Sequence, residues 1–139
     1  MYQDMYERWL AAELDDADLK PELESVKGDD AAIQDRFAVA LKFGTAGLRG
    51  VIGAGTNRMN IYVVRQATQG LANWVKTQGG SQTVAISYDS RIKSNLFART
   101  ASLPAERGAG NSSSVGGRSG CGAKYATRSI GARFCDRSA

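Results

Sequence analysis

One glycine-rich run, residues 43–58, constrains this chain more than any other part of its 139 residues. Its sequence is FGTAGLRGVIGAGTNR, with glycines at 44, 47, 50, 53 and 55, two threonines and two arginines, directly ahead of an amphipathic segment. Glycine adopts positive φ without a Cβ clash, so main-chain N–H groups there can approach an anion closely. Arginine adds a planar fork of donors that matches a phosphate group. The run therefore predicts a site for a phosphorylated small molecule.

Two nucleotide-binding motifs are alternatives for these glycines. The dinucleotide fingerprint G-x-G-x-x-G would need a glycine where the sequence starting at Gly53 has Arg58, and no G-x4-G-K-[ST] loop occurs in the chain. A third alternative is structural: the glycines only form a tight turn between a strand and a helix.

The spacing of apolar residues predicts helices and strands in alternation. Spacings of three and four residues predict helices over about 2–15, 21–28, 30–44, 61–76 and 94–101. Short apolar runs predict strands at 48–52 and 83–88. This order of elements predicts an α/β layer domain with some parallel strand pairing.

Details of two helices can be tested against a structure. The helix near residue 30 is expected to be capped by Asp29 or Asp30, with Ala40 and Leu41 facing the core near its end. The helix over 61–76 is expected to be capped by Asn57 or Asn60, with Leu71, Trp74 and Val75 in its buried stripe.

Composition excludes several classes of site. Histidine is absent, so the polypeptide contains no Ser-His-Asp triad, Cys-His pair or His-ligated zinc site. No apolar run approaches the roughly 18–20 residues of a membrane span, and the first residues carry acidic side chains and no signal-peptide core. We therefore expect a cytoplasmic protein with no membrane partner.

The composition changes at residue 102. Residues 102–139 contain seven glycines, seven serines and both cysteines, without a helical or strand period. Residues 100–139 hold six basic and two acidic side chains, which account for the whole net charge of +4. This composition is typical of disorder or a linker. Cys121 and Cys135 have no C-x-x-C or histidine partners and are interpreted as free thiols.

The octet FGTAGLRG, followed by GAGTNRMN, closely resembles the amino-terminal domain of the α-D-phosphohexomutases, the phosphoglucomutase and phosphomannomutase enzymes. The resemblance covers about residues 1–101. It implies an incomplete first domain, a three-layer α/β/α fold with a mixed sheet that is preceded by N-terminal helices. It divides the chain into a helical lead-in (1–42), a partial domain I (43–101) and a tail (102–139).

The resemblance also gives roles to residues of the glycine-rich run. Thr45, Gly47 and Arg49 match the family's phosphate-binding run, with Thr45 and Arg49 on the active-site floor near the catalytic phosphoserine. Arg49 would neutralise phosphoryl charge. Arg58 would do the same, or it is a solvated residue at the entry to the following helix.

A second match lies just after the strand predicted at 83–88. Asp89-Ser90-Arg91 resembles the family's D-x-R turn, in which Arg91 points into the cleft and Asp89 orients it. Open α/β sheets place ligand contacts at this end of a strand. The alternative is a helix-capping aspartate beside a surface arginine.

The family interconverts hexose 1-phosphate and hexose 6-phosphate through a bisphosphorylated sugar, with Mg2+ and glucose 1,6-bisphosphate as cofactors. Its catalytic serine lies in a T-A-S-H-N-P loop, its metal in a D-G-D-x-D-R loop and its sugar contacts in a G-E-x-S-G loop, none of which occurs here. We therefore expect neither a catalytic residue nor a bound metal or cofactor in this chain, and no turnover by the chain alone. Glucose phosphates are the first expected substrate pair, and mannose or pentose phosphates the second.

The same resemblance offers another hypothesis for the tail. Codons for residues 106–110, read one base later, can spell Asn-Gly-Val-Arg-Val, a family-like continuation, so the tail is interpreted either as disordered or as out-of-frame translation. Two further classes of function stay open: a non-catalytic phosphosugar- or anion-binding module, and a nucleic-acid binder acting through the basic tail. Because the tail contains only two aromatic residues, Tyr125 and Phe134, we expect no nucleic-acid partner.

Overall fold

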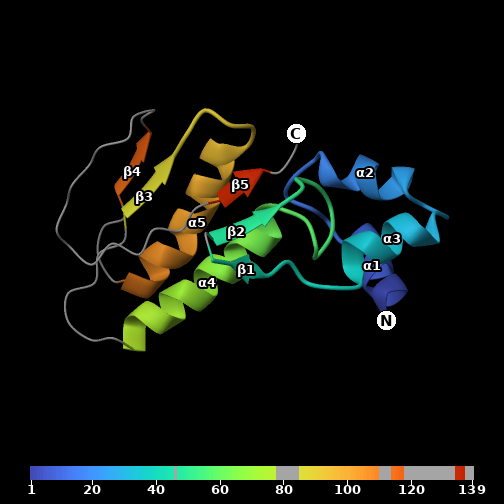
Figure 1. Ribbon diagram of the computed structural model, residues 1–139, viewed down its shortest axis with the longest axis horizontal. Helices are drawn as coiled ribbons and strands as arrows, with labels where there is room; N and C mark the ends of the chain where they lie inside the picture. The colour runs from blue at the N-terminus through green and yellow to red at the C-terminus, as the bar shows by residue number, and fades with distance from the viewer. Residues whose placement is uncertain (46, 78–84, 110–113, 118–133, 137–139) are drawn as a thin grey trace. The chain divides into compact units, whose positions relative to one another are not determined.

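The computed structural model describes residues 1–45, 47–77, 85–109, 114–117 and 134–136 (Figure 1). It divides into two compact units, residues 1–63 with 135–139, and residues 64–134. Each unit is considered by itself.

The first unit begins with three short helices, α1 (Tyr2–Ala11), α2 (Leu19–Ser25) and α3 (Asp30–Phe37). Their apolar faces enclose a core in which the rings of Tyr6 and Trp9 meet Phe37 edge to face, with centroids 5.9 and 5.7 Å apart. The Tyr6 hydroxyl donates to the carbonyl of Leu23, 3.0 Å away, so this buried ring is not left with an unpaired polar atom. The three predicted lead-in helices are confirmed, and so is the cap of the third, because the Asp29 carboxylate accepts from the Ala32 N–H at 3.1 Å.

All three helices end earlier than the sequence predicts, and the second ends at Ser25 rather than near residue 28. The first ends at Ala11 rather than near residue 15, and the third ends at Phe37, which leaves Ala40 exposed and Leu41 half-buried. The prediction that Ala40 faces the core is therefore wrong. The physical reason is that the chain after Phe37 bonds to a loop instead of continuing the helix: the N–H of Leu41 donates to the carbonyl of Thr56 at 2.8 Å.

The glycine-rich run begins with a hairpin. Strands β1 (Phe43–Gly44) and β2 (Gly47–Gly50) pair antiparallel, with Phe43 opposite Leu48. β5 (Phe134–Asp136) completes a sheet of order β1-β2-β5. The strand predicted at 48–52 is confirmed as far as Gly50, and Ile52 beyond it forms an isolated bridge with Met59. The partner strand β1 was not predicted.

Helix α4 (Ile61–Thr77) begins in the first unit and continues in the second. Its buried stripe runs through Val64, Thr68, Ala72 and Val75, at spacings of three and four residues. Trp74 lies beside this stripe and is 51% exposed, so its predicted place in the core is wrong.

The second unit contains a strand–helix–strand arrangement. β3 (Ala85–Tyr88) and β4 (Ser114–Gly117) pair in parallel, from Ala85 opposite Ser114 to Tyr88 opposite Gly117, and α5 (Ser94–Ala109) connects them (Figure 1). The predicted α/β class and the parallel pairing are confirmed. Antiparallel and parallel pairs occur in two separate small sheets within the described ranges.

Regular structure extends beyond residue 101, where the composition predicts none. α5 continues to Ala109, and β4 and β5 both lie in the glycine- and serine-rich part of the chain. Residues 110–113, 118–133 and 137–139, which include Cys121, lie outside the described part, so the predictions for them are not tested. None of the helices in the described ranges combines the length and the apolar character needed to cross a membrane.

Candidate functional site

The β1–β2 hairpin exposes the two side chains that the sequence predicts for phosphate binding. Thr45 follows β1 at the turn and is exposed, and along β2 the buried Leu48 is followed by the exposed Arg49. Gly47, where β2 begins, has φ +108°, a conformation that a side chain would strain. Among the described residues, the Arg49 side chain has no hydrogen-bond or ion-pair partner. Its guanidinium is therefore available for an anion.

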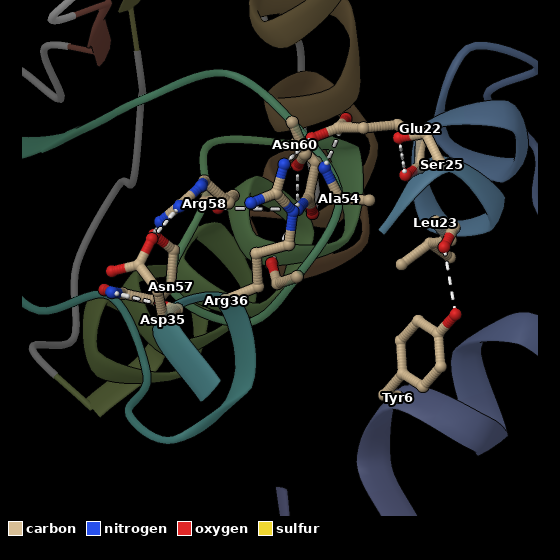
Figure 2. Close-up of polar contacts among 12 residues, drawn as sticks. Tyr6, Glu22, Leu23, Ser25, Asp35, Arg36, Ala54, Asn57, Arg58 and Asn60 are labelled. Atoms are coloured by element: carbon tan, nitrogen blue, oxygen red, sulfur yellow. Dashed lines mark hydrogen bonds and ion pairs between the residues drawn. The ribbon is translucent and has the colours of Figure 1, made fainter. Parts of the chain in front are cut away.

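The second part of the run, residues 51–60, turns inward and is organised by Asn60. This side chain is 1% exposed, and its amide nitrogen donates to the carbonyls of Gly53 and Gly55 at 2.9 and 2.8 Å (Figure 2). Its amide oxygen accepts from the N–H groups of Tyr62 and Val63 at 3.1 and 3.0 Å, which caps α4. Asn60 is thus the cap among the two predicted candidates, and it also fixes the loop before the helix.

Arg58 is held by the protein rather than directed freely to solvent. Its guanidinium forms an ion pair with the carboxylate of Asp35 at the end of α3 and donates to the carbonyl of Asn57 at 3.2 Å (Figure 2). Asn57 adds a bond from its own side chain to the carbonyl of Asp35, at 2.9 Å. The Arg58 side chain is only 11% exposed, so neither a solvated helix-entry residue nor a free anion contact describes it in this structure.

The Asp89–Arg91 turn follows β3 in the second unit. The Asp89 carboxylate accepts from Nε of Arg91 at 2.8 Å and from its main-chain N–H at 3.1 Å, which fixes the Arg91 side chain beside it. The direction of Arg91 into a cleft stays a prediction. The hydrogen bond from the Arg91 side chain, with that from its N–H, holds the pKa of the Asp89 carboxyl below its ordinary value. Ser94, at the start of α5, accepts from the Asp89 N–H at 3.2 Å, and Lys93 between them has φ +58°. The turn is therefore locally fixed, with both charged groups about half exposed.

The six predicted site residues fall into two groups. Thr45, Gly47, Arg49 and Arg58 lie in the first unit, and Asp89 and Arg91 lie in the second, so their predicted convergence on one ligand stays a prediction. Sequence reasoning did not find the residues that hold the loop from behind, which are Glu22, Asp35 and Arg36. In the sequence these three are ordinary charged residues of predicted helices. Such residues are usually solvated, so their charge gave no signal of contact with the loop.

The described residues do not provide a metal site. Within these ranges, no three acidic, cysteine or histidine side chains come together as a bound metal ion would need. They therefore do not fit the Mg2+ that the family resemblance implies, and we assign no metal-binding role to them.

Comparison with known proteins agrees with the family resemblance of the glycine-rich run. The family model described as phosphoglucomutase/phosphomannomutase, alpha/beta/alpha domain I, matches residues 40–109. The chain is 46% identical over 74 residues to the phosphoribomutase of Saccharomyces cerevisiae, covering 52% of this chain and 12% of that protein. It is 35% identical over 111 residues to the probable phosphoribomutase of Schizosaccharomyces pombe, covering 76% of this chain and 19% of that protein. The phosphoglucomutase of Staphylococcus aureus (strain USA300) is 39% identical over 70 residues, covering 50% and 13%.

These alignments cover only a small part of each relative, between 12% and 19% of its length in the three proteins named. No solved structure matches the chain.

Proposed function

The chain belongs to the phosphoglucomutase/phosphomannomutase family, and from this membership we propose that its glycine-rich run binds the phosphoryl group of a phosphorylated sugar. The observation that carries the proposal is the exposed Arg49 on β2, which has no partner among the described residues. A guanidinium in that position offers two parallel N–H donors to phosphate oxygens. The exposed Thr45 hydroxyl is a neighbouring donor on the same hairpin, and Gly47 permits the turn with its φ of +108°.

The family chemistry accounts for what such a site contributes. Phosphoryl transfer depends on positioning and on the stabilisation of charge over the phosphoryl oxygens. Arg49 would supply fixed positive charge to such a group, and the Thr45 hydroxyl would be a neighbouring hydrogen-bond donor. In the second unit, considered by itself, the Asp89–Arg91 turn holds another guanidinium that a carboxylate orients.

The proposed ligands are aldose phosphates, first the glucose 1-phosphate and glucose 6-phosphate pair. The yeast relatives are named phosphoribomutases and the staphylococcal relatives phosphoglucomutases, so pentose phosphates are the second class to test, with mannose phosphates. Glucose 1,6-bisphosphate and Mg2+ belong to this proposal as the cofactors of the complete reaction. The proposed location is the cytoplasm.

We further propose that this chain by itself binds a phosphosugar without converting it, as a non-catalytic module would. Its sequence contains no T-A-S-H-N-P, D-G-D-x-D-R or G-E-x-S-G loop, the family loops for phosphoserine, metal and sugar. A coupled assay of the purified chain with glucose 1-phosphate, Mg2+ and glucose 1,6-bisphosphate is expected to equal the blank without protein. Turnover above that blank would contradict this part of the proposal.

Titration calorimetry with glucose 1,6-bisphosphate tests the binding site. Arg49→Ala is expected to weaken binding about tenfold to hundredfold, the range for losing a charged hydrogen bond. Arg99→Ala is the matched control, because Arg99 is also exposed but lies on α5, and its affinity should equal that of the unchanged protein. Equal affinities of the Arg49 and Arg99 variants would refute the assignment. Salt-dependent retention on DNA, with no phosphosugar binding, would favour the nucleic-acid alternative.

A further inference from the structure

The loop of the glycine-rich run is clasped by two helix residues that lie far from it in sequence. Glu22 on α2 accepts from the N–H of Ala54 at 2.9 Å through one carboxylate oxygen (Figure 2). Its other oxygen accepts from the guanidinium of Arg36 on α3 at 3.0 Å. Ala54 is fully buried, and the Glu22 carboxylate is the partner that satisfies its N–H. One carboxylate thus joins two helices and the loop.

The end of α3 adds a main-chain contact to this clasp. The carbonyl of Arg36 lies in the last turn of the helix, where carbonyls lack a partner within the helix. It accepts from the N–H of Asn57 at 2.9 Å. The hydroxyl of Thr56 meanwhile donates to the carbonyl of Val39 at 3.1 Å. The loop therefore satisfies the end of the helix, and the helix in turn fixes the loop.

This close approach explains one of the glycines without reference to a ligand. A Cβ at position 55 would lie 2.7 Å from the carbonyl oxygen of Arg36, and this main-chain atom cannot easily move aside, so Gly55 is required by the end of α3. A Cβ at position 53 would lie 2.6 Å from a carboxylate oxygen of Glu22, so a side chain there would displace this carboxylate. The clasped segment is therefore shaped from the side of the lead-in helices.

We propose that Glu22 and Arg36 are positioning residues, which set the shape of the segment from Gly53 to Asn57 and through it the exit of β2 that carries Arg49. The link to β2 is the N–H of Met59, which donates to the carbonyl of Val51 at 2.7 Å. The expected effect of these residues on phosphosugar affinity rests on the proposed function. Their expected effect on the shape of the loop does not. Neither residue contacts the ligand in this proposal.

The two residues depend on each other. The Glu22 and Arg36 side chains are 29% and 18% exposed, and Nε of Arg36 is buried without a hydrogen-bond partner in the described part of the chain. Removal of the carboxylate therefore leaves a partly buried guanidinium with even fewer partners. Glu22→Gln keeps one oxygen that can accept from the Ala54 N–H, but it removes the charge and replaces the oxygen that accepts from Arg36 with an NH2 donor. It therefore separates the bond to the loop from the ion pair with Arg36.

Amide hydrogen exchange, followed by NMR, tests the shape of the loop directly. In Glu22→Ala, exchange at the N–H of Ala54 is expected to accelerate about tenfold or more, the effect of losing one hydrogen bond. Glu22→Gln should restore most of the protection, and it remains informative if Glu22→Ala does not fold. Glu24→Ala, an exposed glutamate of the same helix, is the matched control and should leave Ala54 protected. Equal protection of Ala54 in the Glu22→Ala and Glu24→Ala proteins would overturn the proposal.

Calorimetry with glucose 1,6-bisphosphate on the same variants tests the consequence for binding. If the loop positions Arg49, Glu22→Ala should weaken binding about tenfold, and Glu22→Gln should recover affinity in parallel with the protection of Ala54. A general loss of stability would not make the affinity of Glu22→Gln follow the protection of Ala54, so this parallel recovery distinguishes positioning from destabilisation. If the unchanged protein does not bind, the proposed function fails and the exchange data still decide the shape of the loop. Unchanged affinity beside an unprotected Ala54 would overturn the link to the site.

Discussion

The two parts of the glycine-rich run differ in what their polar groups contact. In residues 43–50 the polar side chains point outward: Thr45 and Arg49 are exposed, and Arg49 has no partner among the described residues. In residues 51–60 they point inward, where Asn60 alone bonds two carbonyls and two N–H groups. The glycines of this one stretch are thus needed for two different physical reasons. In the first part they allow a turn that exposes hydrogen-bond donors, and in the second part they allow a loop to pack tightly against helices.

Burial also differs between the two parts, although Leu48 of the first part is buried and Val51 of the second part is 49% exposed. Phe43 at the start of the run is 59% exposed, whereas Ala54 and Met59 are completely buried. The difference separates residues that a ligand can reach from residues that only the protein contacts. Substitutions in the two parts should therefore affect different measurements, with affinity changing in the first and stability in the second.

The largest expected effect is that of Asn60→Ala. The substitution removes both donors to the loop carbonyls and the cap of α4, and it should lower the free energy of unfolding by about 4 kcal/mol. Urea denaturation followed by circular dichroism would measure it. The control is Asn73→Ala on the same helix, where the exposed amide oxygen accepts from Gln69, and a change within about 0.5 kcal/mol is expected. A similar loss in both variants would remove the special role of Asn60.

Glycine substitutions test the contrast next. Gly55→Ala places a Cβ 2.7 Å from the carbonyl oxygen of Arg36 at φ +131°, and should cost about 3 kcal/mol in the free energy of unfolding. Gly44→Ala in the hairpin meets nothing closer than 3.7 Å and should change it by less than about 1 kcal/mol. Gly70→Ala, in the interior of α4 with open space around it, should stabilise by about 1 kcal/mol. Equal costs at 44 and 55 would break the comparison.

The two arginines of the run should respond in opposite ways. Arg58→Ala breaks the ion pair with Asp35 and should lower the free energy of unfolding by about 1 kcal/mol, because the arginine is largely buried and its partner is exposed. Arg49→Ala should leave it within about 0.5 kcal/mol. Thermal unfolding of both variants, set beside their phosphosugar affinities, measures the contrast. If the stability of the Arg58→Ala protein were unchanged, Arg58 would not contribute to packing and would behave like the exposed residues 43–50.

The smallest effect concerns the Asp89–Arg91 turn. The hydrogen bond from Arg91 lowers the pKa of Asp89 in the folded chain, so its stabilisation is complete above the unfolded value, about 3.9, and is lost as the pH falls through the lower folded value. Because both side chains are about half exposed, the contribution to stability should be under about 0.5 kcal/mol. An NMR titration should show the pKa of Asp89 rising in Arg91→Ala and unchanged in Arg99→Ala. No rise in the former would mean that the pair does not persist in solution.

Much of the fold follows from local patterns. Asp29 and Asn60 act as caps because a short polar side chain before an apolar period reaches the free N–H groups of the first turn. The end of α3 and the exposure of Trp74 did not follow from such patterns. The helix ends where Arg36, Val39 and Leu41 bond to the distant loop, and the buried stripe of α4 is set by what packs on it. Both depend on contacts between residues far apart in sequence.

The candidate site was predictable only in its exposed part. Arg49 and Thr45 belong to the motif itself, so the family resemblance is enough to identify them. Glu22 and Arg36 belong to helices whose charged residues usually face water, and nothing in their spacing predicts a shared bond to Ala54. The spacing of the glycines also gave no means of separating Gly47, at a turn, from Gly55, against a helix.

The parallel pairing of β3 with β4 affects how fast the chain can fold. Ala85 pairs with Ser114, and the whole of α5 lies between them in the sequence. Forming this contact therefore costs the entropy of closing a long loop before the contact stabilises the chain. The helices of the first unit form from neighbours much closer along the chain, and such local contacts form faster. The strand pair should therefore be the later structure to form.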